Sequence, residues 1–264
     1  MMKTLGILGL GHMGMALAKG AASCLGADQI SAYDPSDRKC EEAAALGIER
    51  CQSVSQLCGS AHIVLVAVRP QDIGSLLETM KESVPECILT IAAGIPISRF
   101  TDALGPIPVM RAMPNTPLQL SEGAAALCRN ELCSDRDFEL ALSLFQAMGK
   151  ACAIDESHMC DIIAVNGSTP AYFYYLIECL LNDAVARGIN EADARTLLVQ
   201  TMIGSGKMLM EQPDKPIGVF VDEVCSKGGT TIEAINVLRE GGMEDLIKKA
   251  DTACIRRAEE LGKE

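Results

Sequence analysis

The spacing of apolar residues changes character along the chain. In the first part, short apolar runs end at or just before a glycine or proline, which is typical of buried strands followed by a turn or helix. These runs lie at residues 4–8, 29–33, 62–68, 87–94 and 109–113. Because they alternate with segments of helical periodicity, the pattern predicts an α/β domain with a mostly parallel, doubly wound sheet.

From about residue 155 onward, helical periodicity replaces this alternation. We expect helices at residues 161–187, 191–210, 230–239 and 244–261, separated by breaks rich in glycine and proline. The first of them contains AYFYYLIECLL and has few polar positions, which indicates that protein surrounds it on most sides. A helical domain of roughly 110 residues has limited internal volume, so a second subunit is expected to bury part of this surface. The chain is therefore predicted to comprise an α/β domain, 1–154, and an all-helical dimerisation domain, 155–264.

The charge balance narrows the class of partner. The chain has 23 lysines and arginines against 35 acidic residues, a net charge of -12, so nucleic acid and anionic membranes are unlikely partners. Any anionic ligand must then be bound by local dipoles and a few placed cations rather than by the overall field.

The cysteines and the apolar segments indicate the compartment. The twelve cysteines are scattered without a Cys-x-x-Cys pair, which favours reduced thiols in the cytoplasm over a disulfide framework. No apolar run approaches the ~20 residues of a membrane span, and the four glycines between residues 6 and 14 argue against a signal peptide. No metal site is predicted.

The most informative local motif is GLGHMG at residues 9–14, which follows a short strand and opens an alanine-rich helix. In a dinucleotide-binding, Rossmann-type domain the first glycine permits a tight turn, the second lets the backbone approach a pyrophosphate, and the third allows close packing of helix and strand. The candidate cofactor residues here are Gly9, Leu10, Gly11, His12, Met13 and Gly14.

The residues after the second strand leave the type of dinucleotide open. Asp34 follows that strand at about the distance where an acid receives the adenosine ribose hydroxyls, which favours NADH. Ser36, Arg38 and Lys39 bring a hydroxyl and two cations to the same rim, where they could bind the 2′-phosphate of NADPH.

The ends of the later strands predict further cofactor contacts. In an open parallel sheet, ligands lie outside the carboxyl ends of the strands. The residues that should therefore face the cofactor crevice are Val68, Arg69, Pro70, Ala92, Ala93, Gly94, Met113, Pro114 and Asn115.

A second candidate site is the stretch SKGGTTIEAINVL, at residues 226–238. Thr230 is predicted to be an N-cap, with Glu233 completing a capping box. Gly228 and Gly229 leave backbone amides uncovered in front of this helix, so the loop is a candidate anion site. The alternative is a capped helix that merely follows a flexible loop.

Taken together, these motifs resemble those of the pyrroline-5-carboxylate reductase family. The resemblance rests on GLGHMG, on VRPQ (68–71), AAGI (92–95) and RAMPNTP (111–117), on GSTPAYFY (167–174) and on SKGGTTIEAINVL, in matching order over nearly the whole chain. It implies that helical domains interlock into a dimer, with dimers sometimes forming decamers. The chain departs from the family at Thr169, usually glycine, and at Lys227, usually proline.

The resemblance also implies an activity and roles for the second site. The reaction would be reduction of 1-pyrroline-5-carboxylate to L-proline, the last step of proline biosynthesis, with NADPH or NADH as the cofactor. The substrate carboxylate would be held by the Ser226 hydroxyl and by the amides of Gly228, Gly229 and Thr230. Thr231 would be the catalytic partner of the imine nitrogen, in an active site shared between subunits.

Two other functions remain open from the sequence. A β-hydroxyacid dehydrogenase shares the plan, but that family relies on a catalytic lysine where this chain has NGSTPAYFYY, and no lysine lies between Lys150 and Lys207. A non-catalytic nicotinamide-binding regulator is motivated only by the departures at Thr169 and Lys227.

Overall fold

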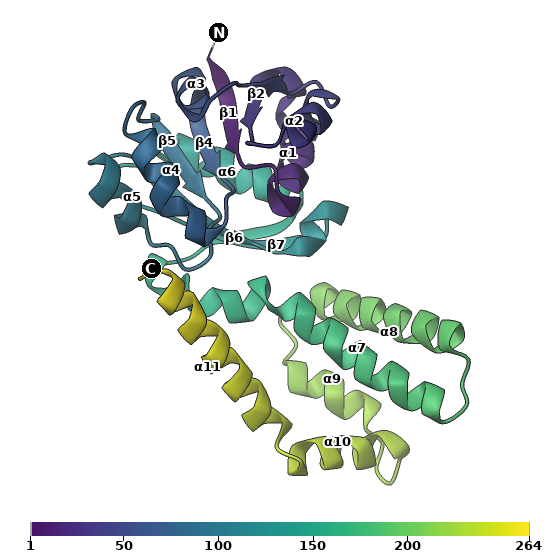
Figure 1. The fold of residues 1–264 in the computed structure, drawn as a ribbon. Helices are drawn as coiled ribbons and strands as arrows, with labels where there is room; N and C mark the ends of the chain where they lie inside the picture. The colour runs from purple at the N-terminus through teal and green to yellow at the C-terminus, as the bar shows by residue number, and fades with distance from the viewer. Residues whose placement is uncertain (1, 264) are drawn as a thin grey trace. The chain divides into compact units, whose positions relative to one another are not determined.

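The α/β part of the chain is built on one eight-stranded sheet (Figure 1). The computed structural model describes residues 2–263. The strand order is β3-β2-β1-β4-β5-β6-β7-β8, and every neighbouring pair is parallel except β6 and β7. The strands are Lys3–Leu8 (β1), Ile30–Tyr33 (β2), Glu49–Arg50 (β3), Ala61–Val66 (β4), Cys87–Thr90 (β5), Val109–Pro114 (β6), Gly123–Arg129 (β7) and Gly149–Ala153 (β8).

Helices cover both faces of this sheet, which confirms the doubly wound arrangement. Alternate strand residues point to opposite faces: Leu5 and Ile7 of β1 belong to one apolar cluster, whereas Leu8 belongs to the other. One cluster includes residues of α1 (His12–Leu25), α2 (Asp37–Ala44) and α6 (Asp135–Gln146), and the other includes residues of α3 (Val54–Ser60), α4 (Ile73–Met80) and α5 (Ile97–Leu104). The carboxyl ends of the parallel strands are thereby left free to position a ligand.

The C-terminal part is helical, as predicted, but its details differ. The expected helix at 161–187 is divided into a π-helical turn, Ile163–Gly167, and α7, Thr169–Ala186. The Thr169 hydroxyl donates to the carbonyls of Ala164 at 2.6 Å and Val165 at 2.7 Å, so it accompanies the transition between the two. The other helices are α8 (Glu191–Glu211), α9 (Ile217–Val224), α10 (Thr230–Glu240) and α11 (Met243–Leu261). Helix α9 lies outside the predicted segments.

The chain forms two compact units. One extends to Pro170 and includes the end of α11 from Cys254 onward, and the other is Ala171–Ala253. The range 155–264 thus contributes to both units, and the domain boundary at 154/155 stays a prediction. None of the described helices is long and apolar enough to cross a bilayer.

The second unit exposes much of its apolar surface. Within Ala171–Ala253, all of which the structure describes, only Ala194 is buried. Large side chains stand open to solvent, including Tyr175 and Ile217, each 68% exposed. An apolar surface of this extent is typical of a site that contacts another protein, a membrane or a ligand.

At the opposite end of β4 from the carboxyl edge, His62 joins three segments of the first unit. Its Nδ1 lies 2.7 Å from Glu86 Oε2, just before β5, and its Nε2 lies 2.8 Å from Asp137 Oδ1, in the first turn of α6. The hydrogen bonds to Glu86 and Asp137 raise the pKa of His62. Burial tends to raise the pKa of Asp137, but its bonds to His62 and Ser134 hold that pKa below its usual value.

This bridge predicts a pH-dependent contribution to stability. Because the folded-state pKa of His62 lies above its unfolded value of about 6.5, protonated His62 stabilises fully below that value. The contribution is lost as the pH rises through the raised pKa. His62→Gln should therefore lower the melting temperature at pH 6 and have a smaller effect at pH 8 and above. The effect will be modest, because the His62 side chain is 39% exposed.

Thermal unfolding followed between pH 5 and pH 9 checks this expectation. The matched control is His158→Gln, because His158 is an exposed histidine of the short 3-10 helix Glu156–His158 and its ion pair is with Asp161, three residues along the chain. An equal loss of melting temperature at every pH would show that the His62 bridge does not depend on its charge.

Candidate active site

The glycine motif forms a tight connection between β1 and α1. Gly9 has φ 95°, a backbone conformation that favours glycine, and its amide donates to the Tyr33 carbonyl at 2.9 Å. A Cβ atom on Gly14 would lie 2.0 Å from the Gly9 carbonyl oxygen, so only glycine permits this approach of helix to strand. A Cβ atom on Gly11 would meet nothing within 4 Å.

The N-terminus of α1 is open to an anion. The helix begins at His12 with Gly11 as its N-cap, and no side chain caps it. The first amides of a helix have no partner within it, and the helix dipole adds partial positive charge there. This arrangement suits a pyrophosphate, as predicted for residues 9–14.

A cavity of about 720 Å³ opens at the carboxyl ends of β1, β2 and β4. Its volume falls within the range of roughly 300–1,000 Å³ that is usual for ligand sites. Five of the predicted cofactor residues line it: Gly9, Gly11, Asp34, Val68 and Arg69. The cavity also brings in Lys39, one of the two cations that the sequence placed at this rim, and Tyr33, which was not predicted.

Asp34 lies at the end of β2 and is only 8% exposed. Its Oδ2 accepts from the Leu10 amide at 2.8 Å and from Lys39 Nζ at 3.2 Å, and its Oδ1 accepts from the Ser36 amide at 2.9 Å. Burial tends to raise the pKa of Asp34, but the bonds from Leu10, Ser36 and Lys39 outweigh it and keep that pKa below its usual value. Asp34 is therefore an ionised carboxylate that links the glycine loop to the start of α2.

Two predicted cations are engaged on the surface. Arg38 Nη1 lies 2.8 Å from Glu42 Oε1, and the Arg38 side chain is 77% exposed. Arg69 Nε lies 2.9 Å from Asp72 Oδ2, next to the cavity. Ser36 precedes α2 as its N-cap residue, and its side chain does not cap the helix.

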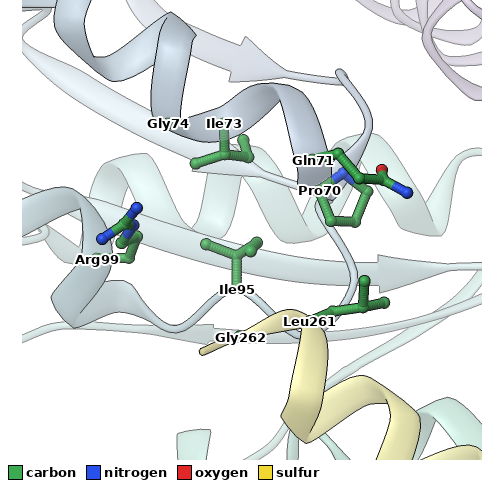
Figure 2. A pocket seen from close by; sticks show the side chains of 8 residues that line it. All are labelled: Pro70, Gln71, Ile73, Gly74, Ile95, Arg99, Leu261 and Gly262. Carbon is green, nitrogen blue, oxygen red and sulfur yellow. The ribbon is translucent and has the colours of Figure 1, made fainter. Parts of the chain in front are cut away.

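Pro70 and the loop that follows β5 lie beside a second cavity, separate from the large one. Pro70 lines a smaller cavity of about 170 Å³, with Ile95 and Arg99 on one side and Leu261 at the end of α11 on another (Figure 2). Ala92 is buried, and a Cβ atom on Gly94 would lie 2.2 Å from the Ala258 carbonyl oxygen. The Ala92–Ala93–Gly94 loop therefore packs against the end of α11.

The end of β6 is fixed by a network of two asparagines. Asn115 Oδ1 accepts from the Ala124 amide at 2.8 Å, and its Nδ2 donates to the Asn166 carbonyl at 3.2 Å. Asn166 Nδ2 in turn donates to the carbonyls of Met113 at 2.8 Å and Ala124 at 3.0 Å. This network places Met113, Pro114 and Asn115 beside the π-helical turn. The sequence offered no signal for Asn166.

The candidate substrate loop lies in the second unit and differs from the predicted capping box. The N-cap of α10 is Gly229 rather than Thr230, and no side chain caps the helix. Thr230 is already helical because the preceding turn closes one residue earlier, where the Gly229 amide donates to the Ser226 carbonyl at 2.9 Å. The N-terminus of α10 is consequently more open to an anion than the capping box would allow.

The turn before α10 depends on glycine. Gly228 has φ 72°, and a Cβ atom on Gly229 would lie 2.4 Å from the Ser226 Oγ. Lys227 occupies the second position of this four-residue turn, where proline is favoured in related turn types. Thr231 follows as the second residue of α10 and is half-buried. Ser226 and the amides of α10 thus surround one open helix N-terminus.

The first unit fits a bound dinucleotide. Its open helix N-terminus, the free space around the Cβ position of Gly11 and the adjoining cavity match a pyrophosphate and the adenosine next to it. Among the described residues, no cluster of three or more histidine, cysteine or acidic side chains could hold a metal ion.

Comparison with known proteins relates both units to one family. The family model for pyrroline-5-carboxylate reductase dimerisation matches residues 156–261, and that for NADP oxidoreductase coenzyme F420-dependent matches residues 4–94. The chain is 35% identical to the pyrroline-5-carboxylate reductase of Escherichia coli (strain K12) over 272 residues, with all of both chains covered. It is 33% identical to that of Methanosarcina acetivorans, with 98% of each chain covered.

Solved structures agree in fold over the whole length. A pyrroline-5-carboxylate reductase from Coxiella burnetii superposes with a TM-score of 0.90 at 30% identity and covers all of both chains. The Plasmodium falciparum pyrroline carboxylate reductase with NADP bound gives a TM-score of 0.88 at 27% identity and covers 98% of each chain. From its glycine loop to its helical C-terminal part, the chain belongs to the pyrroline-5-carboxylate reductase family.

Proposed function

We propose that this protein reduces 1-pyrroline-5-carboxylate to L-proline with NAD(P)H, the final step of proline biosynthesis. The observation that carries the proposal is the open N-terminus of α10 behind Gly228 and Gly229, in a chain similar over its full length to reductases of this name. The family membership does not favour the β-hydroxyacid dehydrogenase alternative.

The substrate carboxylate is the anion proposed for this helix end. The amides of Gly228, Gly229 and Thr230, together with the Ser226 hydroxyl, supply donors to it, and the dipole of α10 adds positive charge. Hydrogen bonds to a charged group contribute on the order of 1.5–3 kcal/mol each. A few of them hold the carboxylate without a buried arginine.

Thr231 is the proposed partner of the reacting nitrogen. Its hydroxyl lies one residue into α10, next to the carboxylate donors, so it orients the C=N bond and favours the protonated nitrogen. When bound, NAD(P)H supplies a hydride from nicotinamide C4 to carbon C5 of that bond. The loop formed by Gly9, Gly11 and Gly14 presents the N-terminus of α1 to the pyrophosphate, and the predicted residues Asp34, Val68 and Arg69 line the adjoining cavity. Much of the rate enhancement then comes from proximity and orientation of the reacting groups.

The apolar surface of Ala171–Ala253 supports a homodimer, with further assembly into a decamer, and an active site shared between subunits. Light scattering at several concentrations distinguishes these states by multiples of the 28.1 kDa chain, and a monomer at all of them would overturn the proposal.

The twelve cysteines, all free, support a cytoplasmic location, which cell fractionation tests.

The reaction is tested by mixing the purified protein with 1-pyrroline-5-carboxylate and either NADH or NADPH. Loss of nicotinamide absorbance, with formation of proline, is expected with at least one cofactor. The control omits the pyrroline and should show no turnover. Cofactor binding without turnover would instead identify the protein as a non-catalytic regulator.

A further inference from the structure

Asp34 stands where an acid normally accepts hydrogen bonds from the ribose of NAD. In this protein the carboxylate is 8% exposed and already accepts hydrogen bonds from Leu10, Ser36 and Lys39 at 2.8, 2.9 and 3.2 Å. Both oxygens are therefore occupied by protein donors. The first task of Asp34 is to hold the glycine loop and the start of α2 together.

One consequence of these bonds is the direction of Lys39. Its ammonium is drawn to Asp34 at the edge of the large cavity, and Lys39 is one of the residues that line this cavity. The Lys39 side chain remains 34% exposed, so its nitrogen can also meet a ligand. Lysine carries three donors on this nitrogen and uses one of them on Asp34.

The neighbouring cation is directed elsewhere. Arg38 is bonded to Glu42 on the next turn of α2 and does not line the cavity. Successive helix residues point about 100° apart, and the two side chains take different directions here: Arg38 toward Glu42 and Lys39 toward Asp34. Of the pair that the sequence offered, Lys39 is the one at the cavity.

A phosphate on the adenosine ribose would carry up to two negative charges into this region. Asp34 alone would repel it, but its own charge is compensated by two amides and by the ammonium of Lys39. Ser36 follows Pro35, which lines the cavity, and its hydroxyl does not cap α2, so it offers a second donor beside the cavity. The cavity is therefore suited to a phosphorylated ribose despite the acid at the end of β2.

We propose that Lys39, held in place by Asp34, selects NADPH by binding the 2′-phosphate of its adenosine ribose, with Ser36 as a second donor. Asp34 is a positioning residue and not the ribose ligand. The inference rests on the proposed function for the use of a dinucleotide, and it deepens that function by assigning the residue that discriminates between NADPH and NADH.

The test measures binding of two adenosine fragments by calorimetry, which requires no turnover. The full-length protein is expected to bind 2′,5′-ADP more tightly than 5′-AMP. Lys39→Gln should lower the affinity for 2′,5′-ADP at least tenfold, which is the loss expected for one charge-assisted hydrogen bond. The affinity for 5′-AMP should change less than twofold. Lys19→Gln, an exposed lysine on α1, is the matched control and should change neither.

Two further variants separate this proposal from its alternatives. A larger loss of 2′,5′-ADP binding in Arg38→Gln than in Lys39→Gln would transfer the role to Arg38 and overturn the proposal. Asp34→Asn should lower the affinity for 2′,5′-ADP more than the affinity for 5′-AMP, because Lys39 loses its charged partner. If Asp34 were the ribose ligand, the same change would raise the affinity for 2′,5′-ADP relative to that for 5′-AMP.

The outcomes also separate the proposal from the reaction itself. Equal affinity of the unaltered protein for both fragments would overturn the selectivity, while turnover with 1-pyrroline-5-carboxylate would still establish the reaction. Conversely, the protein could bind 2′,5′-ADP selectively through Lys39 and show no turnover. That outcome would support the proposed phosphate site and refute the catalytic function. The melting temperature of each variant shows that any loss of binding arises in a folded protein.

Discussion

Replacing Thr231 by alanine is expected to lower kcat by more than tenfold while the fold stays intact. Thr231 lies in the first turn of α10, next to the proposed carboxylate donors. A positioned proton-transfer or hydrogen-bonding group contributes roughly 10²–10⁴-fold to a rate. The N-cap of α10 is the backbone of Gly229, so loss of the Thr231 hydroxyl removes no helix cap.

Steady-state kinetics of three variants at this position isolate the hydroxyl. Thr231→Ser retains it and should keep most of the activity, whereas Thr231→Val keeps the shape and should resemble Thr231→Ala. Thr252→Ala is the control, because Thr252 is an exposed helical threonine whose hydroxyl donates to the Lys248 carbonyl. Wild-type kcat and KM in Thr231→Ala would remove Thr231 from the mechanism.

The second large effect is expected in the glycine loop, where substitutions of two glycines should have different effects on stability and on cofactor affinity. The Cβ atom of Gly14→Ala would lie 2.0 Å from the Gly9 carbonyl oxygen and 3.2 Å from the Ala67 Cβ, so the loop must shift. Overpacking of this kind costs about 1–3 kcal/mol, and the shifted loop should also bind NAD(P)H poorly. The protein should therefore lose both melting temperature and cofactor affinity.

Gly11→Ala should affect the cofactor alone. Nothing lies within 4 Å of its Cβ position, and its φ of -65° suits alanine, so the melting temperature should change little. The added methyl group would occupy the space in which the backbone approaches the pyrophosphate, and affinity should fall more than tenfold. Melting temperature and NAD(P)H titration of both variants check the contrast, which unchanged affinity in Gly11→Ala would contradict.

The sheet could be predicted wherever an apolar run ends in a strong turn signal. Strands β1, β2, β4, β5 and β6 were found in this way. β7 was missed because its sequence, GAAALCR, is rich in alanine, which has no strand preference. β8 joins the sheet through its pairing with β7, a contact between distant segments.

The site was predictable in kind but not in detail. The glycine loop has a local sequence signature, because its turn and its helix approach depend on residues only a few positions apart. The position of the α10 N-cap was misplaced by one residue, since the turn from Ser226 to Gly229 competes with a threonine cap. Asn166 was missed because its partners, Met113 and Ala124, are remote in sequence.

The sequence by itself determined the dinucleotide-binding loop, the change from α/β to helical structure and the family, because these depend on periodicity and on motifs with local geometry. Only the tertiary structure decided what Asp34, Arg38 and Lys39 do, since their directions depend on the fold around them. The amide that Leu10 offers to Asp34 comes from 24 residues away, and the phase of α2 separates adjacent cations. The direction of a side chain at such a site depends on contacts between segments that are distant in sequence, so no local motif predicts it.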